Sequence, residues 1–154
     1  MLRLCQMTES ALPDVINLQR KVSIDVKSIR SFVENVQSTV PEGQKRRFAV
    51  AFVGDKRMRE LNSTFRGKDT TTDVLSFSSE PEPFETGTDQ LGDIVISAEQ
   101  AARQAEENGL SLESEIKQLI LHGVLHLCGY DHETDTGQMD KREIELREQL
   151  GIDR

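Results

Sequence analysis

The sequence predicts one α+β domain in which a small, mixed, four-stranded sheet is packed with about five helices. Three observations lead to this prediction. The length of 154 residues suits a single domain that folds without disulfides. Strand-like and helix-like patterns follow each other in the order strand, helix, strand, helix, two strands and three helices. The sequence contains neither internal repeats nor low-complexity segments.

A strand and a helix are expected first, followed by a second strand. Apolar and polar residues alternate from Val15 to Lys21, which predicts a strand. From 25 to 40 the apolar residues have helical spacing, with Asp25 as the N-cap and Pro41 as the stop. The run 48–53 is apolar throughout. We therefore expect it to form a strand that is buried on both faces at the centre of the sheet.

The middle of the chain is expected to form a short helix and two more strands. Helical spacing from Met58 to Phe65 predicts the helix, which ends in the polar loop 66–72. Strands are expected at 74–77 and 93–97. We expect the acidic, proline-containing connector between these two strands to be mobile.

Three helices complete the predicted domain, and the first of them is rich in alanine. Ser111 can cap the second, which is expected from 112 to 128 and should pack across the sheet. The third is expected from 135 to 150. It carries Glu143 and Arg147 four residues apart, where they can form an ion pair.

All three histidines of the chain, His122, His126 and His132, lie within eleven residues. Residues four apart share one face of a helix, so the first two imidazoles can bind one ion. Gly129 can end the helix in a left-handed conformation and return His132 toward that ion. This spacing is typical of a three-histidine zinc site with one position open to water. We therefore predict a metal centre that suits zinc best, although nickel, copper or iron would also accept imidazole.

Residues near these histidines bear on the chemistry. Zinc proteases with this spacing have a glutamate after the first histidine, whereas this chain has Gly123, which cannot transfer a proton. Asp131 and Glu133 are the nearest candidates for a general base, although an exposed turn explains them equally well. Cys128 falls on the opposite side of the helix and is interpreted as a small packed apolar residue. Asp73 and Asp93 could each orient a histidine ligand or cap a strand.

Positive charge is concentrated in one segment of an acidic protein. The net charge is −8, which alone argues against nucleic acid as a ligand. Residues 45–68, however, carry eight basic and two acidic side chains, a net charge of +6, so the remainder carries −14. A solvated face explains this segment as well as a nucleic-acid track does. The basic residues are Lys45, Arg46, Arg47, Lys56, Arg57, Arg59, Arg66 and Lys68.

Cysteine content and hydropathy bound the environment of the protein. Cys5 and Cys128 are the only cysteines, which favours a reducing, cytoplasmic compartment. The longest apolar run, 48–53, is far shorter than the roughly 20 residues of a membrane helix, so no membrane association is expected. The N-terminus has no apolar core of the kind found in signal peptides. It is compatible with the remainder of a trimmed targeting segment, which would place the protein in an organelle matrix or stroma.

Five blocks of residues together resemble the YbeY family of endoribonucleases and ribosomal RNA maturation factors. The resemblance extends from about 15 to 150, so we treat 1–14 as an N-terminal extension and 15–154 as one metal-dependent hydrolase domain. Thr71 and Ser78 stand where relatives often have proline. The blocks are Leu61-Asn62, Phe65-Arg66-Gly67-Lys68-Asp69, Thr72-Asp73-Val74-Leu75-Ser76-Phe77, Leu91-Gly92-Asp93-Ile94 and His122 to His132.

The resemblance implies a zincin-like fold, a three-histidine zinc site and hydrolysis of single-stranded RNA, including trimming near the 3′ end of small-subunit ribosomal RNA. It also implies a role in ribosome maturation or quality control, with the small ribosomal subunit and a ribosomal protein as partners. By position, His122, His126 and His132 would be the metal ligands and Arg66 would face the RNA groove. The residues then expected to contact RNA are Arg57, Arg59, Arg66 and Lys68.

Three hypotheses follow for the function. In the first, a zinc-bound water attacks an RNA phosphodiester while Arg66, with Lys68, stabilises charge on the phosphate. In the second, the protein is a peptidase-like zinc hydrolase whose general base is displaced, for example to Glu133. In the third, the metal is structural and the protein assists ribosome assembly without cleaving RNA, with a side chain such as Asp131 closing the metal site.

Overall fold

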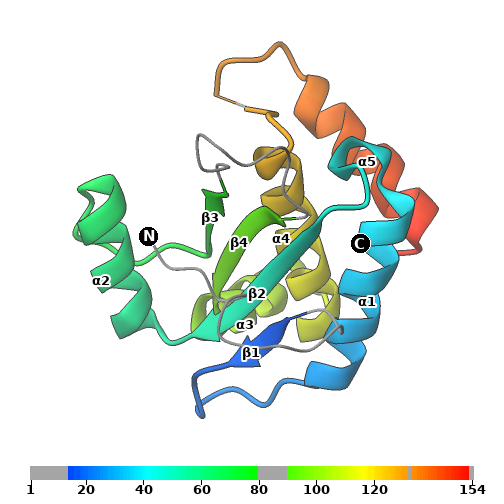
Figure 1. Ribbon diagram of the computed structural model, residues 1–154. Helices are drawn as coiled ribbons and strands as arrows, with labels where there is room; N and C mark the ends of the chain where they lie inside the picture. Colours follow the sequence, from blue (N-terminus) through cyan, green and yellow to red (C-terminus); the bar gives the residue numbers. More distant parts are fainter. Residues whose placement is uncertain (1–13, 80–89, 132, 153–154) are drawn as a thin grey trace.

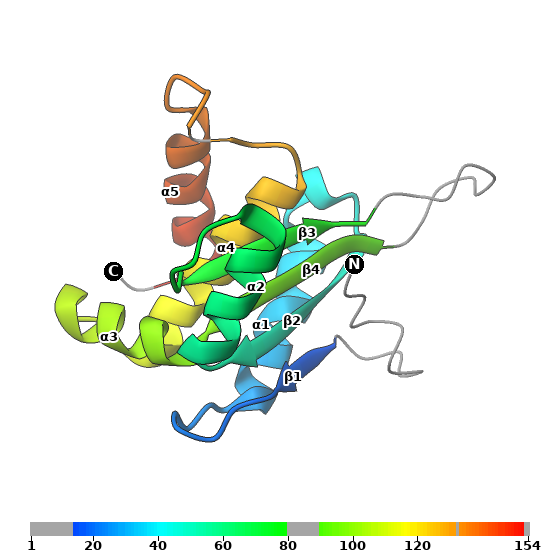
Figure 2. The same ribbon diagram turned by 90° about the vertical axis from the view of Figure 1, so that its left-hand side faces the viewer.

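Four strands form one mixed sheet, with helices on both of its faces (Figure 1 and Figure 2). The computed structural model describes residues 14–79, 90–131 and 133–152. Within them the strand order is β1-β2-β4-β3; β1, β2 and β4 are parallel, and β3 is antiparallel to β4. This arrangement confirms the predicted mixed sheet. The strands are β1 (Val15–Asn17), β2 (Arg47–Val53), β3 (Val74–Ser78) and β4 (Gln90–Ser97).

The helices divide the core into a large and a small part. On one face, α1, α4 and α5 pack with β2 and β4 into the large core, and on the other face α2 covers a smaller core against β3 and β4. In Figure 1, α2 lies to the left of the sheet, and α1 and α5 lie to its right. The helices are α1 (Val26–Thr39), α2 (Asp55–Arg66), α3 (Ala98–Asn108), α4 (Leu112–Leu127) and α5 (Gln138–Leu150), with a short 3-10 turn η2 (Pro41–Gly43).

Strand β2 is the central apolar strand that the sequence predicts. It lies between β1 and β4, and six of its seven residues are buried. Phe48, Val50 and Phe52 face the large core, and the alternate residues Ala49 and Ala51 face the opposite side. A strand that is apolar on both faces therefore has helices or a second core on both sides, as in parallel sheets generally.

Most element boundaries agree with the sequence-based prediction, and the differences have local causes. Strand β1 ends at Asn17 instead of Lys21, because the Gln19 side chain bonds to Asn17 and Val22 and closes a turn. Helix α5 begins at Gln138 instead of 135, since the Asp135 carboxylate accepts hydrogen bonds from the N–H groups of the next turn. The connector between β3 and β4 that was expected to be mobile falls largely on 80–89, outside the described residues.

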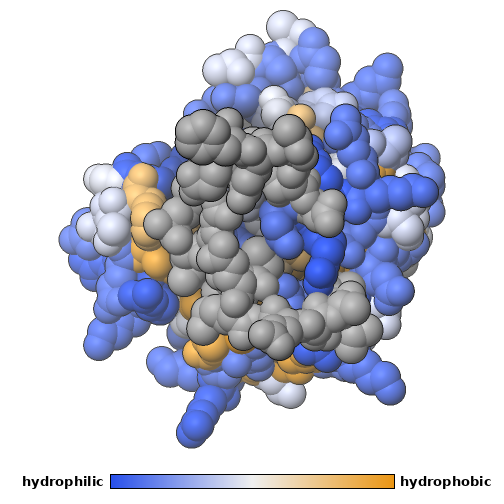
Figure 3. Space-filling view, viewed as in Figure 1, coloured by the Kyte–Doolittle hydropathy of each residue, from blue (hydrophilic) through white to orange (hydrophobic). Residues whose placement is uncertain are grey.

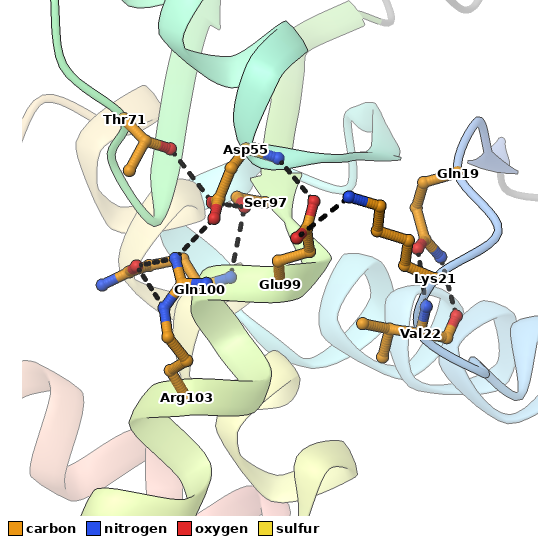
Figure 4. Close-up of polar contacts among 9 residues, drawn as sticks. All are labelled: Gln19, Lys21, Val22, Asp55, Thr71, Ser97, Glu99, Gln100 and Arg103. Atoms are coloured by element: carbon orange, nitrogen blue, oxygen red, sulfur yellow. Dashed lines mark hydrogen bonds and ion pairs between the residues drawn. The ribbon is translucent and has the colours of Figure 1, made fainter.

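A polar network joins the start of α2, the C-terminal end of β4 and helix α3 (Figure 4). Asp55 accepts hydrogen bonds from Ser97 at 2.7 Å, Arg103 at 2.6 Å and Thr71 at 3.2 Å. Burial alone would raise the pKa of Asp55, but these hydrogen bonds and the charge of Arg103 hold its pKa below the ordinary value. The network fixes the start of α2, and therefore the direction in which that helix runs.

Among the helices of the described residues, none is long and apolar enough to span a membrane.

A second polar contact ties α5 to the turn η2. Arg142 donates to both carboxylate oxygens of Glu42, at 2.6 and 3.0 Å, and the Tyr130 hydroxyl donates to the same group at 3.2 Å. Both charged side chains are mostly buried, with 19% of Glu42 and 23% of Arg142 exposed. The hydrogen bond from Arg142 is the main reason that the pKa of Glu42 lies below its ordinary value of 4.5.

We expect Glu42→Gln to lower the free energy of unfolding by about 1–3 kcal/mol at neutral pH, because it removes a charge-assisted pair that is largely shielded from water. A lowered folded-state pKa means that this stabilisation is complete above pH 4.5 and is lost as the pH falls through the lower folded value. Urea unfolding across the acidic range should therefore show a shallower pH dependence for the variant than for wild type. The exposed Glu34→Gln serves as control, and equal curves for all three proteins would contradict the expectation.

Candidate metal centre and cleft

A cleft of about 660 Å³ lies between the end of α4, strand β3 and the last residue of α2. Its lining is mainly polar, and it includes two of the three histidines of the motif. His132, the third, lies outside the described residues. The lining residues are Arg66, Thr72, Asp73, Val74, Ser76, Ser78, His122, His126, Leu127, Gly129, Tyr130, Asp131 and Glu133.

His122 and His126 project from successive turns of α4 and converge. Their Nε2 atoms are 3.2 Å apart, and their ring planes meet at 74°. Two nitrogens bound tetrahedrally to one zinc ion, each at 2.0–2.1 Å, are about 3.3 Å apart. The donor pair therefore has the chemistry and the spacing that a divalent metal ion requires. Within the described residues, no group of three His, Cys, Asp or Glu side chains is placed to hold a metal.

Glu143 of α5 is a site residue that the sequence analysis did not assign to the site. Its Oε1 lies 2.5 Å from Nδ1 of His122, and its Oε2 accepts a hydrogen bond from Arg147 at 3.1 Å. A hydrogen on Nδ1, donated to the carboxylate, leaves the lone pair of Nε2 facing His126. The predicted ion pair with Arg147 is confirmed, but the same carboxylate also orients the histidine.

The sequence did contain a signal for this role of Glu143. The buried residues of α5 are Met139, Glu143 and Leu146, which share one face of the helix. A carboxylate on an otherwise apolar face needs a polar partner to offset its loss of hydration. That partner is a histidine, which comes from 21 positions earlier in the chain.

The chain turns sharply after His126, as the sequence predicts. Cys128 caps α4, and Gly129 has a φ of 100°, which only glycine adopts without strain. The N–H of Tyr130 then donates to the carbonyl of Leu125 at 3.0 Å, and this bond closes the helix end. Burial raises the pKa of the Cys128 thiol to about 11, so the thiol stays protonated near neutral pH, in agreement with its interpretation as a packed residue.

Gly123 packs closely against the sheet and is not among the residues that line the cleft. A Cβ added there would be 3.0 Å from Cδ1 of Ile94 and 3.1 Å from Oγ of Ser76. The position that carries the base in zinc proteases therefore has no room for a carboxylate in this chain. Asp131 and Glu133 do line the cleft, on an exposed turn in which Asp131 accepts a hydrogen bond from the N–H of Glu133.

Among the four basic residues expected to contact RNA, Arg66 alone lines the cleft with the histidines. It is the last residue of α2, and the left-handed Gly67 follows it. The loop beyond is held by the buried Asn62, whose Nδ2 donates to the carbonyl of Thr70 at 2.9 Å. Asn62 thus helps to place Arg66 beside the cleft.

The other three basic residues lie elsewhere on the surface of α2 and its loop. Arg59 donates two hydrogen bonds to Asp69, at 2.8 and 3.0 Å, and Arg57 pairs with Glu60 at 3.1 Å. Lys68 is exposed and outside the cleft lining. Arg57 and Arg59 would have to exchange their carboxylate partners for phosphates if RNA extended along α2.

The two aspartates considered as orienting groups have different environments. Asp73 lines the cleft and accepts a hydrogen bond from Gln104 at 3.3 Å. Asp93 is buried within β4. The carboxylate that the structure pairs with His122 belongs to Glu143.

Comparisons with known proteins agree on one family. The family model described as Endoribonuclease YbeY matches residues 14–151. The Endoribonuclease YbeY of Carboxydothermus hydrogenoformans is 38% identical over 146 residues, which cover 93% of this chain and 100% of that protein. The one from Nautilia profundicola is 51% identical over 98 residues, covering 64% of this chain and 68% of that protein.

A solved structure shares the fold. The solution structure of TM1509 from Thermotoga maritima matches with a TM-score of 0.60 and 26% sequence identity. The match covers 90% of this chain and 89% of that one. The α+β architecture predicted from the sequence is thus confirmed both by the strands and helices of this chain and by an independent structure.

We expect Gly123→Glu to lower the free energy of unfolding by about 3 kcal/mol or more, because a carboxylate would have to enter the packed contact with Ile94 and Ser76. Gly123→Ala should cost less, about 1 kcal/mol. Urea denaturation measures both losses of stability. A peptide library tests Gly123→Glu for peptidase activity, and we expect none. A Gly123→Glu protein as stable as wild type would contradict the packing argument.

Proposed function

This chain belongs to the Endoribonuclease YbeY family, and we propose that it is a zinc-dependent endoribonuclease that cleaves single-stranded RNA. The observation that carries the proposal is the convergence of His122 and His126 in a cleft whose wall includes Arg66. These residues combine a pair of metal-binding nitrogens with a group that binds phosphate. In metal-assisted hydrolysis of a phosphodiester, the first activates the attacking water and the second stabilises charge on the phosphate.

We propose His122, His126 and His132 as the ligands of the zinc ion. The 3.2 Å spacing of the first two Nε2 atoms and the carboxylate on His122 support this assignment. When bound, the metal would supply Lewis acidity, which makes water acidic enough to act as a nucleophile near neutral pH. Nickel or another divalent ion would satisfy the same nitrogen donors.

The residues of the chain itself would bind and orient the substrate. The planar guanidinium of Arg66 can donate two parallel hydrogen bonds to phosphate oxygens, and it would stabilise the charge that develops on them. Asp131 and Glu133 are the carboxylates of the cleft turn that could accept a proton from the attacking water. A peptidase mechanism has less support, because the usual position of its base is Gly123, packed against the sheet.

The proposed biological substrate is ribosomal RNA, near the 3′ end of the small-subunit species. The support for this is the sequence resemblance of the histidine motif and the Thr72 to Phe77 block. The small ribosomal subunit and a ribosomal protein are the proposed partners, in the cytoplasm, where ribosomes mature. Exposed Arg57, Arg59 and Lys68 would extend the contact with the RNA backbone beyond the cleft.

Cleavage of precursor small-subunit ribosomal RNA by purified protein tests the proposal. We expect Arg66→Ala to retain its metal and to lose about 100-fold or more of the cleavage rate, since a donor to the transition state is removed. His126→Ala should lose both metal and cleavage, and a chelator should stop the wild-type reaction. Arg20→Ala, which removes an exposed arginine near the opposite edge of the sheet, is the control.

Two results would count against this function. Equal cleavage by wild type and by both site variants would identify the activity as a contaminant. Cleavage that persists in a chelator would remove the role of the metal.

We expect Glu143→Gln to weaken zinc binding by about 10- to 100-fold, because an amide is a weaker acceptor for the Nδ1 hydrogen of His122. Competition with a chromophoric chelator measures the affinity directly, without relying on RNA cleavage. Glu148→Gln, an exposed position on the same helix, is the matched control. An unchanged zinc affinity in Glu143→Gln would show that the carboxylate does not support the metal site.

A further inference from the structure

Phe65 is an exposed aromatic residue directly beside the cleft arginine. It lies in the last turn of α2, next to Arg66, and 46% of it is exposed. Helical spacing with Met58 and Leu61 would favour burial, yet those two residues are buried and Phe65 is not. The other large apolar residues with comparable exposure in the described part of the chain, Leu18 and Ile144, are aliphatic. Figure 3 shows hydrophobic surface beside α2 within a mainly hydrophilic face.

Phe65 is held in position by a second aromatic ring. Its ring centroid lies 5.2 Å from that of Phe77, and the ring planes meet at 72°. This edge-to-face arrangement is favourable for aromatic pairs. Phe77 in turn packs against the small core beneath α2, which includes Leu61 and Leu75. The exposed ring is therefore fixed by its neighbour, so little conformational entropy would be lost when a flat ligand stacks on it.

The strand that carries Phe77 connects this aromatic pair to the cleft. Side chains alternate along β3, so Ser76 and Ser78 line the cleft while Phe77 points to the α2 side. Strand β3 is an edge strand of the sheet. The last turn of α2 beside it carries both Phe65, which contacts Phe77, and Arg66, which lines the cleft.

We propose that Phe65 is a stacking platform for an unpaired nucleobase of the RNA strand, next to the nucleotide whose phosphate Arg66 binds. The inference rests on the proposed nuclease function and specifies how single strands are selected. Aromatic side chains stack on the face of any base, which gives affinity without sequence preference. In a duplex both faces of each base are already stacked, so the ring contacts a base only where the strand is unpaired.

Charge around the platform favours a nucleic acid over an apolar partner. Arg66 and Lys68 follow Phe65 in the sequence and are exposed. Arg57 and Arg59 lie on the same helix, are also exposed, and pair with Glu60 and Asp69. A strand of phosphates would be attracted to this surface, whereas an apolar protein surface would have to desolvate it. The combination of a basic surface with an exposed aromatic ring is the arrangement by which proteins bind single strands.

The chain contains no tryptophan, which makes a direct spectroscopic test possible. In Phe65→Trp the new indole is the only one, and we expect oligouridine to quench its fluorescence on binding to the metal-loaded protein. The same strand with abasic nucleotides should quench it far less, since its phosphates are intact but its bases are missing. Leu18→Trp, on the far side of the sheet, is the matched control and should not respond to either strand.

Substitutions that remove or keep the aromatic ring at position 65 complete the test. We expect Phe65→Leu to weaken binding of oligouridine about 5- to 100-fold and Phe65→Tyr to bind like wild type, as measured by fluorescence anisotropy. Neither should change the affinity for the abasic strand, which has no bases to stack on the ring. Quenching by the abasic strand as strong as by oligouridine, or wild-type binding by Phe65→Leu, would overturn the inference.

The failure of this inference can be distinguished from failure of the proposed function. If wild type cleaves RNA in a chelator-sensitive way while Phe65→Leu binds normally, only the stacking platform is wrong. If wild type neither binds nor cleaves single-stranded RNA, the nuclease proposal itself fails. Fluorescence of Phe65→Trp that changes with protein concentration in the absence of RNA would identify the ring as a contact between copies of the chain and would also overturn the inference.

Discussion

The close packing of α4 against the sheet is the constraint on which the rest of the site depends. Gly123 lets the helix approach Ile94 and Ser76 closely, since an added Cβ would lie 3.0–3.1 Å from these side chains. In this orientation His122 and His126 line the cleft, while Leu121 and Leu125 are buried in the core. The same helix contacts α1, α3, α5, β3 and β4. A displacement of His122 and His126 would therefore disturb most of the large core, which gives the site a rigid support.

The core and the site also share their polar residues. Glu143 is buried with Met139 and Leu146 on the inner face of α5, yet its oxygens contact His122 and Arg147. One residue earlier on the same helix, Arg142 binds Glu42, which accepts a hydrogen bond from the Tyr130 hydroxyl in the turn that follows the histidines. Helix α5 thus supports the cleft from two directions although it contributes no residue to the cleft lining.

The sequence predicted what local interactions decide. Asp25 and Ser111 cap their helices as expected, and Gly129 adopts the left-handed conformation that ends α4. What it could not predict depends on residues that meet only in the folded chain. Strand β4 begins earlier than expected, at Gln90, because Gly92 is a poor strand former and its presence argued against a strand there. The glycine is required by a neighbouring strand, since a Cβ at this position would lie 2.3 Å from the carbonyl oxygen of Phe77. The position of Glu143 on the apolar face of α5 indicates that it needs a polar partner, but local patterns could not identify His122 as that partner.

The order of the elements along the chain has a consequence for synthesis. His122 and His126 of α4 are synthesised before α5, so His122 gains its carboxylate partner Glu143 only after α5 has been made and has docked. This contact is thus among the last parts of the described domain to form. Any activity that depends on the orientation of His122 would therefore begin only once the last helix of the described residues is in place.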